Sequence, residues 1–253
     1  NWAPRAMCVI KPQNTEQVSQ VLSCLNENHI DAVPRTGGSS VTMGLEPVEG
    51  GVIIDGCDMC EILNIDERNR IVTAQCGTPL EYLEEQLNKM GYTTGHYPQS
   101  LPLASLGGLT ATRSIGQFST LYGGIEDCIL ALEAVLADGS IVRIKNVPRR
   151  STGPDLRHIF IGSEGTMGFI TEISMKLYEY HPENRRMHAY GVIGMQRGLD
   201  FIREIMVAGY RPAVVRLHDE FEVQELMGAP APEGYAMLLF IAEGPKTIAD
   251  ATG

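Results

Sequence analysis

The segment from Tyr92 to Gly124 constrains the fold more than any other part of the chain. It is rich in glycine, serine, threonine and proline and shows little amphipathic periodicity, so it predicts no long helix or strand. It is also longer than an ordinary connection in a compact domain, and loops of that length are usually functional or disordered. Apolar side chains within it favour an ordered loop, because they can anchor it to a core; they are Leu101, Leu103, Leu106 and Leu109.

The sequence before this loop predicts two helices and several strands. Asn14 can cap a helix whose apolar residues recur at helical spacing until the pattern ends after His29. Those apolar residues are Val18, Val21, Leu22 and Leu25. Strands are expected at Ala32–Pro34, Val52–Asp55 and Arg70–Gln75.

A second helix is expected to begin after Thr78, where three signals agree. Thr78 can act as the cap, Pro79 occupies the first helical position, and Glu81 can close a capping box. The helix is expected to end at Gly91. Its inward face should carry Leu80, Leu83, Leu87 and Met90.

The sequence after the loop predicts further strands. Ile129–Val135 and Ile141–Ile144 flank Asp138-Gly139, a residue pair that suits a tight β-hairpin. A short helix is expected at Asp155–Ile161. Alternating apolar and polar residues predict a strand over Phe169–Tyr178.

The polar stretch His181–Arg186 is expected to mark a domain boundary, which gives domains at residues 1–181 and 187–253. In the second domain, strands near 189–193, 213–217 and 235–242 alternate with helices near 198–208 and after Asp219. This is the opening of an α/β unit that stops at Gly253 without a closing helix or strand. Half a domain cannot bury its own apolar face, and the chain lacks an initiator methionine. We therefore expect a trimmed piece of a longer protein.

Composition excludes several classes of protein. The chain is 43% apolar, which argues against intrinsic disorder, and no apolar run approaches the roughly 20 residues that a bilayer span needs. Lys and Arg number 20 against 31 Asp and Glu, so the net charge of −11 repels phosphate backbones and anionic lipids. Nucleic-acid and membrane-surface binding are therefore not expected, and no signal peptide is recognisable.

The six cysteines are scattered and predict no disulfide framework. Cys57 and Cys60 have metal-type spacing, but no second Cys or His pair follows at matching spacing. We expect thiols in a reducing cytoplasm and no metal site. Redox or metal chemistry at Cys57 and Cys60 is the open alternative.

Three segments rich in glycine and hydroxyl residues are candidates for ligand binding. The first comprises Pro34, Arg35, Thr36, Gly37, Gly38, Ser39 and Ser40. It follows a strand and can expose consecutive backbone N–H groups to phosphate oxygens. It lacks the lysine of a P-loop and the spaced glycines of the Rossmann fingerprint. A turn used only for its geometry would have the same composition.

The other two segments have the same character. The second lies in the long loop and comprises Gln99, Ser100, Leu101, Pro102, Leu103, Ala104, Ser105, Gly107 and Gly108, followed by Thr112, Arg113, Ser114 and Ile115. The third comprises Glu164, Gly165, Thr166, Met167, Gly168, Phe169 and Ile170. Small residues let a backbone approach a flat ligand, although a purely structural loop is the alternative. Three such segments are what an elongated dinucleotide requires, because its pyrophosphate, its adenine and its second ring each need a separate binding surface.

In combination the segments resemble the p-cresol-methylhydroxylase-type FAD-binding domain of the vanillyl-alcohol-oxidase superfamily. Within it they are similar to the alkyldihydroxyacetonephosphate-synthase branch, which Arg150–Asp155 followed by Gly162–Thr166 closely matches. Thr112–Lys145, with Arg149 and Arg150, looks even more like bacterial FAD-linked oxidoreductases of the YgcU type. The resemblance implies an α+β domain of two subdomains that bind one FAD, followed by an incomplete α/β cap.

The resemblance also assigns roles. Pro34–Ser40 matches the loop that holds the pyrophosphate, and Gln99–Ser105 and Thr112–Ile115 match segments that line the flavin and its ribityl chain. Glu164–Ile170 matches the strand entry that meets the isoalloxazine and the adenosine.

Two departures from the family pattern concern the first loop. Members with covalent flavin often carry histidine where Ser39 stands, so FAD is expected to bind non-covalently. Thr36 occupies a position that is usually glycine, which costs backbone freedom but leaves a hydroxyl donor. D-2-hydroxy-acid dehydrogenases are similar too, but their usual first loop differs from this one.

Three further polar residues each have a functional and a structural interpretation. Arg113 can neutralise a pyrophosphate or substrate anion, or form an ordinary surface ion pair. Arg216 lies on an otherwise apolar strand, so it is a candidate substrate-anion contact or a partner of Asp219 or Glu220. His218 can act as a base, although a half-exposed structural role is the alternative. The resemblance places the catalytic residues of the family beyond this chain.

The implied function is oxidation of a small hydroxylated substrate, a 2-hydroxy acid or alcohol, by hydride transfer to flavin N5. The electrons would pass to an external acceptor, an electron-transfer protein being one candidate, and the intact protein is expected to be a homo-oligomer. One alternative is an ether-forming transferase that uses FAD without net oxidation. Another is an inactive FAD-binding fragment.

Overall fold

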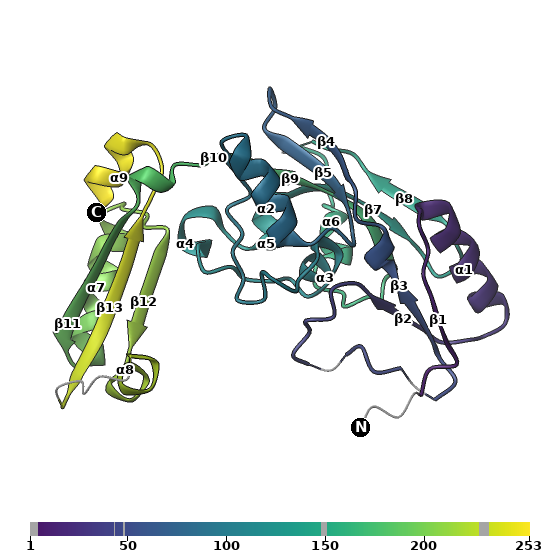
Figure 1. Ribbon diagram of the computed structural model, residues 1–253, viewed down its shortest axis with the longest axis horizontal. Coiled ribbons are helices and arrows are strands. Elements are labelled where there is room, and N and C mark those ends of the chain that lie inside the picture. The colour runs from purple at the N-terminus through teal and green to yellow at the C-terminus, as the bar shows by residue number, and fades with distance from the viewer. Residues whose placement is uncertain (1–4, 43, 48, 148–150, 228–232) are drawn as a thin grey trace. The chain divides into compact units, whose positions relative to one another are not determined.

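The computed structural model describes residues 5–42, 44–47, 49–147, 151–227 and 233–253. It contains two compact units (Figure 1). The first consists of the chain up to Gly116 together with Gly124–Tyr178. The second consists of Gln117–Gly123 together with Glu179–Gly253. Each unit combines helices with a sheet, and the fold is α+β as the resemblance implies.

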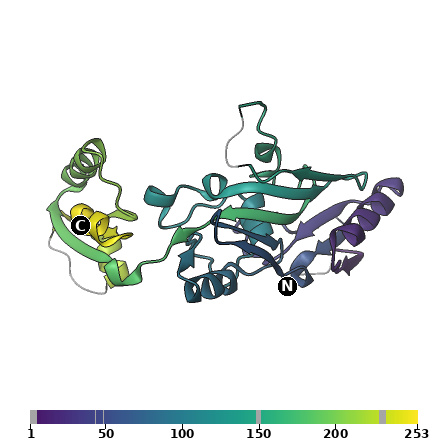
Figure 2. The same cartoon turned by 90° about the horizontal axis from the view of Figure 1, so that it is seen from above.

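A small parallel sheet begins the first unit. Its strand order is β1 (Cys8–Ile10), β3 (Val52–Asp55) and β2 (Ala32–Arg35). The helix α1 (Thr15–Glu27) connects β1 to β2 and lies at one end of this unit (Figure 2). It begins as predicted, because the Asn14 side chain accepts a hydrogen bond from the backbone N–H of Gln17. Val18, Leu22 and Leu25 are buried and attach the helix to the core.

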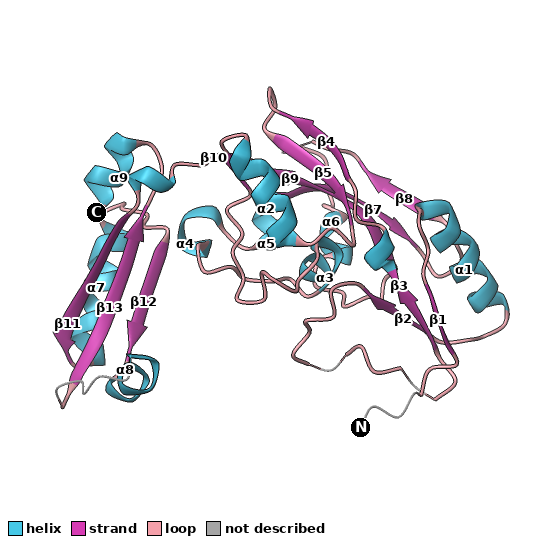
Figure 3. Cartoon of the chain, in the orientation of Figure 1, coloured by secondary structure: helices cyan, strands magenta, loops and turns pink. Residues whose placement is uncertain are grey.

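A five-stranded antiparallel sheet forms the larger part of the first unit (Figure 3). Its order is β4 (Ile62–Asp66), β5 (Ile71–Gln75), β9 (Phe169–Lys176), β7 (Ile129–Val135) and β8 (Ile141–Ile144). The predicted hairpin is confirmed: β7 pairs with β8, and Gly139 between them has a φ of 84°. Every residue of β7 is buried, so both faces of this strand are covered.

The helix α2 (Leu80–Lys89) differs from its prediction at both ends. Leu80, Leu83 and Leu87 are fully buried, and each contributes about 1.5–3 kcal/mol. Thr78 does not cap the helix: Pro79 is the N-cap and no side chain caps it. The backbone of Thr78 instead pairs with the long loop, since its carbonyl accepts from Leu106, while Leu80 N–H donates to Ala104 O. Met90, expected to point inward, is 43% exposed because the helix has ended.

The remaining elements of the first unit are short. They are η1 (Gly56–Asp58), β6 (Tyr92–Thr93), α3 (Leu106–Ala111), α5 (Ile125–Cys128), α6 (Arg157–Phe160) and β10 (Tyr178–Glu179), at which the chain leaves the unit. Hence the long loop carries only short regular elements, as its composition predicts. It is ordered by packing: Leu106 and Leu109 lie in the hydrophobic core.

The second unit is an antiparallel three-stranded sheet with helices. Its strand order is β11 (Arg186–Ile193), β13 (Tyr235–Ala242) and β12 (Val214–His218). The helix α7 (Met195–Val207) packs on it, with the Phe201 ring edge-on to Phe240 at 6.1 Å. The other elements are α4 (Ser119–Tyr122), η2 (Pro182–Asn184), α8 (Glu220–Met227) and α9 (Lys246–Thr252).

The helix α9 corrects the expectation that the second unit stops without a closing helix. Its Ala249 is fully buried, and Ala249 N–H donates to Pro245 O to begin the helix. In the described residues, no helix combines the length and apolarity that crossing a bilayer requires.

Candidate FAD-binding site

The first glycine-rich loop begins where β2 ends and packs directly against the second. Gly37 N–H donates to Ser105 Oγ at 2.8 Å. A Cβ at Gly37 would collide with the Leu103 carbonyl oxygen and lie 2.9 Å from Ser105 N. Gly38 has a φ of 74°, a conformation that favours glycine. Both glycines are therefore required by the local geometry.

The start of this loop is held from the neighbouring strand. Arg35 forms an ion pair of 2.7 Å with Asp55, whose carboxylate also accepts from Cys57 N–H at 3.0 Å. Burial opposes ionisation of Asp55, but the hydrogen bonds from Cys57 and the Arg35 charge hold its pKa below the usual value. The Cys57 thiol donates to Thr36 O at 3.2 Å, and burial raises the pKa of this thiol to about 11. Cys57 is thus a structural thiol that supports the loop.

The tip of the loop exposes backbone donors. Within the described residues, the N–H groups of Gly38, Ser39 and Ser40 have no acceptor in the protein. Successive free N–H groups beside a left-handed glycine form a concave site for an anion. This geometry fits the pyrophosphate of FAD.

The second segment lies between the first loop and the core. Gly107 N–H donates to Cys76 O at 2.8 Å, and a Cβ at Gly107 would lie 2.7 Å from Cys76 Cβ. A Cβ at Gly108 would lie 3.2 Å from Thr36 Oγ1. Thr36 is buried, so its hydroxyl fills space against Gly108. Small residues at these positions let α3 approach both the sheet and the first loop.

The third segment contacts both of the other two. A Cβ at Gly165 would lie 2.7 Å from Pro34 Cγ, and Glu164 N–H donates to Ala111 O at 2.9 Å. Glu164 itself has a φ of 48°. The structure therefore brings all three predicted segments into contact, although they are far apart in the sequence.

The predicted residues of these segments differ in their exposure. Phe169 and Ile170 are buried in β9, and a Cβ at Gly56 would lie 2.9 Å from the Phe169 ring. Leu103, Ile115 and Met167 are exposed. Gln99, Ser100, Leu101 and Pro102 form a turn in which Ser100 O accepts from Leu103 and Ala104.

Arg113 of the second segment forms an ion pair with a residue of α5. Its φ is 50°, and its guanidinium pairs with Glu126 at 3.0 Å. Burial acts to raise the pKa of Glu126, but hydrogen bonds and the Arg113 charge hold it below the usual value. The Arg113 charge is thus already balanced by a carboxylate.

His96 and Ser114 form a partly buried contact beside Arg113. His96 is fully buried, and its Nε2 lies 3.2 Å from Ser114 Oγ. Burial lowers the pKa of His96 to about 4, so the ring is neutral near pH 7. A fully buried, neutral ring in contact with the protein is typical of a structural histidine.

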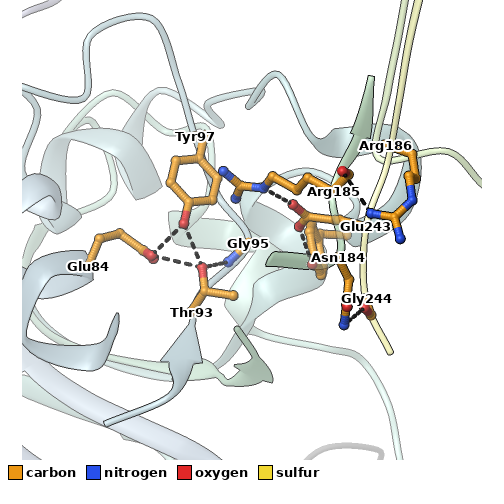
Figure 4. A network of polar contacts seen from close by, with 10 residues as sticks. Glu84, Thr93, Gly95, Tyr97, Asn184, Arg185, Arg186, Glu243 and Gly244 are labelled. Atoms are coloured by element: carbon orange, nitrogen blue, oxygen red, sulfur yellow. Dashed lines mark hydrogen bonds and ion pairs between the residues drawn. The ribbon is translucent and has the colours of Figure 1, made fainter. Parts of the chain in front are cut away.

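Sequence reasoning missed Glu84, which holds the start of the long loop (Figure 4). This buried residue of α2 accepts from Thr93 Oγ1 at 2.8 Å, Thr94 N at 2.8 Å and Tyr97 Oη at 2.9 Å. The sequence did contain a signal for this role, because Glu84 is a carboxylate that lies between Leu80 and Leu87 on the apolar face of a helix. Such a group is buried only when hydrogen bonds compensate for lost hydration.

Three of the four buried side-chain atoms without a partner in the described residues lie in or beside these segments. They are His96 Nδ1, Glu126 Oε2 and Ser163 Oγ; the fourth is Asn88 Oδ1. Buried polar groups are normally hydrogen-bonded, so orphaned atoms mark positions where a ligand or water completes the structure. Together with the free N–H groups, they fit an extended polar ligand such as FAD.

The remaining candidate residues from the sequence lie outside the three glycine-rich segments. Arg216 is half-buried on β12 opposite Leu239, and His218 Nδ1 lies 3.1 Å from Glu222 Oε2. Arg149 and Arg150 lie outside the described residues. Cys60 is exposed, and the described part of the chain gathers no three metal-ligating side chains into one cluster.

Comparison with known proteins defines the class. A protein-family model described as "FAD binding domain" matches residues 6–145, more than half of the chain. The chain therefore belongs to this family of FAD-binding domains, and FAD is the cofactor that its site holds.

Individual relatives show which members of this family the chain is similar to. The chain is 53% identical over 251 residues to the Escherichia coli strain K12 protein named "Uncharacterized FAD-linked oxidoreductase YgcU", covering 99% of this chain and 52% of that protein. It is 34% identical to an alkyldihydroxyacetonephosphate synthase of Caenorhabditis elegans, over 83% of this chain and 36% of the relative.

Solved structures agree with these sequence relationships. A structure of alkyldihydroxyacetonephosphate synthase superposes with a TM-score of 0.86 at 27% identity, covering 96% of this chain and 48% of the other. The chain thus spans about half the length of the FAD-linked relative and of this synthase structure.

Proposed function

We propose that the chain is the FAD-binding part of an oxidoreductase that oxidises a small hydroxylated substrate, a 2-hydroxy acid or an alcohol. The observation that carries this proposal is the convergence of three glycine-rich segments in a chain of an FAD-binding family. Relatives named FAD-linked oxidoreductase, D-lactate dehydrogenase and glycolate oxidase subunit favour oxidation over other reactions. The bound flavin would supply a hydride acceptor at N5, and an external acceptor would take the electrons.

Each segment has a proposed role in holding FAD. The free N–H groups of Gly38, Ser39 and Ser40 would bind the pyrophosphate oxygens. Gln99–Ser105 and Thr112–Ile115 would line the flavin and ribityl chain, and Glu164–Ile170 would meet the isoalloxazine and adenosine. For Phe169 and Ile170 the backbone would make this contact, because their side chains are buried. With serine at position 39, we propose non-covalent attachment.

Two arginines have different proposed roles. Arg113 pairs with Glu126, so we propose that it orients the second segment and does not neutralise the pyrophosphate. Arg216 on β12 is proposed as a substrate-anion contact, because it is a cation on a largely apolar strand. We also propose residues 1–181 as the FAD-binding domain and 187–253 as part of the substrate domain.

An ether-forming transferase that uses FAD without net oxidation is the second candidate. It is favoured by the structural similarity to alkyldihydroxyacetonephosphate synthase. The higher identity to an FAD-linked oxidoreductase supports our preference for oxidation.

Flavin binding and substrate class can be tested separately. The purified protein should show the two visible flavin absorption bands, and denaturation should release free FAD into the supernatant. A protein without these bands would refute the site. For the reaction, the visible band should bleach anaerobically with at least one of a panel of 2-hydroxy acids and alcohols. Failure of the whole panel would favour the transferase.

A further inference from the structure

The chain leaves the first unit at Gly116 and returns to it at Gly124, and the residues between pack with the second unit. We call residues 117–123 the excursion. It follows Thr112–Ile115, the segment proposed to line the flavin, with only Gly116 between them. It precedes α5, which carries the Glu126 partner of Arg113, with only Gly124 between them. The excursion is therefore continuous with the proposed FAD site at both ends.

A buried carboxylate holds the excursion within the second unit. Tyr122 Oη donates to Glu243 Oε1 at 2.5 Å, and Arg185 Nε pairs with Glu243 Oε2 at 2.6 Å. The Glu243 side chain is only 6% exposed, so both of its oxygens need these partners. Tyr122 is buried as well, which excludes water from the contact.

Arg185, whose ion pair with Glu243 is drawn in Figure 4, also contacts the beginning of the excursion. Its guanidinium carbon lies 5.3 Å from the centre of the Phe118 ring and 5.6 Å from that of Tyr180. One carboxylate–guanidinium pair thus holds Phe118 near one end of the excursion and Tyr122 near the other. Next to Arg185, Asn184 donates to Gly244 O at 3.1 Å.

The two ends of the excursion are fixed in the first unit. A Cβ at Gly116 would lie 2.8 Å from Tyr97 N and 3.1 Å from His96 Nδ1. Beyond the other end, Ile125 N–H donates to Ser114 O at 3.1 Å. Few residues separate these fixed points from the excursion, so displacement of the excursion must be absorbed close to Ser114.

We propose that Glu243 is a positioning residue for the flavin site. It holds Tyr122 and Arg185, these hold the excursion, and the excursion fixes the backbone of Thr112–Ile115. This inference rests on the proposed function, because Thr112–Ile115 acts on flavin only if the site binds FAD. Glu243 itself contacts neither flavin nor substrate in this proposal.

The test compares Tyr122→Phe and Glu243→Ala with the wild-type protein. Both variants should speed amide hydrogen exchange across residues 112–123. Both should raise the FAD dissociation constant at least fivefold, measured by flavin fluorescence, and should change the visible circular dichroism of the flavin that remains bound. The dichroism is informative because lower stability alone does not alter the surroundings of bound flavin.

Phe201→Leu is the matched control, since it loosens the packing of α7 on β13 in the same unit without removing a partner of Glu243. It should leave the dissociation constant within twofold of wild type. An equal loss of affinity in this control would overturn the proposal, as would unchanged exchange in Tyr122→Phe. Faster exchange with unchanged affinity would also overturn it while leaving FAD binding intact. A wild-type protein that binds no FAD would refute the proposed function and this inference together.

Discussion

The backbone N–H of Gly37 donates to Ser105 Oγ at 2.8 Å, a hydrogen bond that joins two loops separated by 68 residues of sequence. Around it, the Leu103 carbonyl leaves no room for a side chain on Gly37. The proposed pyrophosphate loop therefore has its position set by the proposed flavin loop. A change in one is expected to disturb the other.

Gly37→Ala is expected to lower FAD affinity at least tenfold, because the new methyl group would separate the two loops. Fluorescence titration of the apoprotein with FAD measures the effect. Gly191→Ala is the control: it lies on β11, where an added Cβ would meet only Tyr235 at an ordinary 3.5 Å. Equal affinity in Gly37→Ala and wild type would contradict the packing argument.

His96 should make stability depend on pH. Burial lowers the pKa of His96 in the folded protein from 6.5 to about 4. Between these two pH values the imidazole is therefore protonated in the unfolded chain and neutral in the folded chain. Stability is therefore expected to fall as the pH drops from 6.5 towards 4, by on the order of 3 kcal/mol in total. Urea unfolding at several pH values measures this dependence. His96→Gln should flatten it, and parallel curves for the two proteins would contradict the assignment.

Glu172 is expected to destabilise the protein near neutral pH. Burial, followed by the nearby charge of Glu133, raises its pKa in the folded state. The stability it contributes is present below the unfolded value of 4.5 and is lost as the pH rises through the folded pKa. Glu172→Gln should therefore raise the unfolding free energy at pH 7 by up to about 1 kcal/mol and leave it unchanged near pH 3. Glu85→Gln, on the exposed side of α2, serves as control.

The cysteines should react with iodoacetamide in two groups. Cys8, Cys24 and Cys60 are exposed and should be modified first. Burial raises the thiol pKa of Cys57 to about 11 and those of Cys76 and Cys128 to about 12, so few thiolates are available at pH 8. Mass spectrometry of timed digests gives the order. Early labelling of Cys57 would contradict its role as a donor to Thr36.

Local signals in the sequence predicted much of the fold. Asn14 caps α1, Gly139 turns the β7–β8 hairpin, and Val52–Asp55 is a strand with the expected bounds. These features depend on neighbouring residues, so composition and periodicity reveal them. The gathering of the three glycine-rich segments was also predicted, from their shared composition and from the resemblance of their combination to a known family.

Features that depend on distant partners were missed. Thr78 has the sequence of a helix cap, yet its backbone is used by residue 106, which no local pattern indicates. Glu84 and Glu243 are buried carboxylates whose partners come from other segments. The excursion was missed for the same reason, since Tyr122 is held by a residue 121 positions later.

The strand β9 lies between β5 and β7, although it is the last strand of the five to leave the ribosome. Until residue 176 has been synthesised, β5 and β7 each lack their neighbour and present unpaired edges. Unpaired strand edges of this kind can pair with other nascent chains and lead to aggregation. The five-stranded sheet thus closes late in translation, and shielding β5 and β7 during that interval is expected to raise the yield of folded protein.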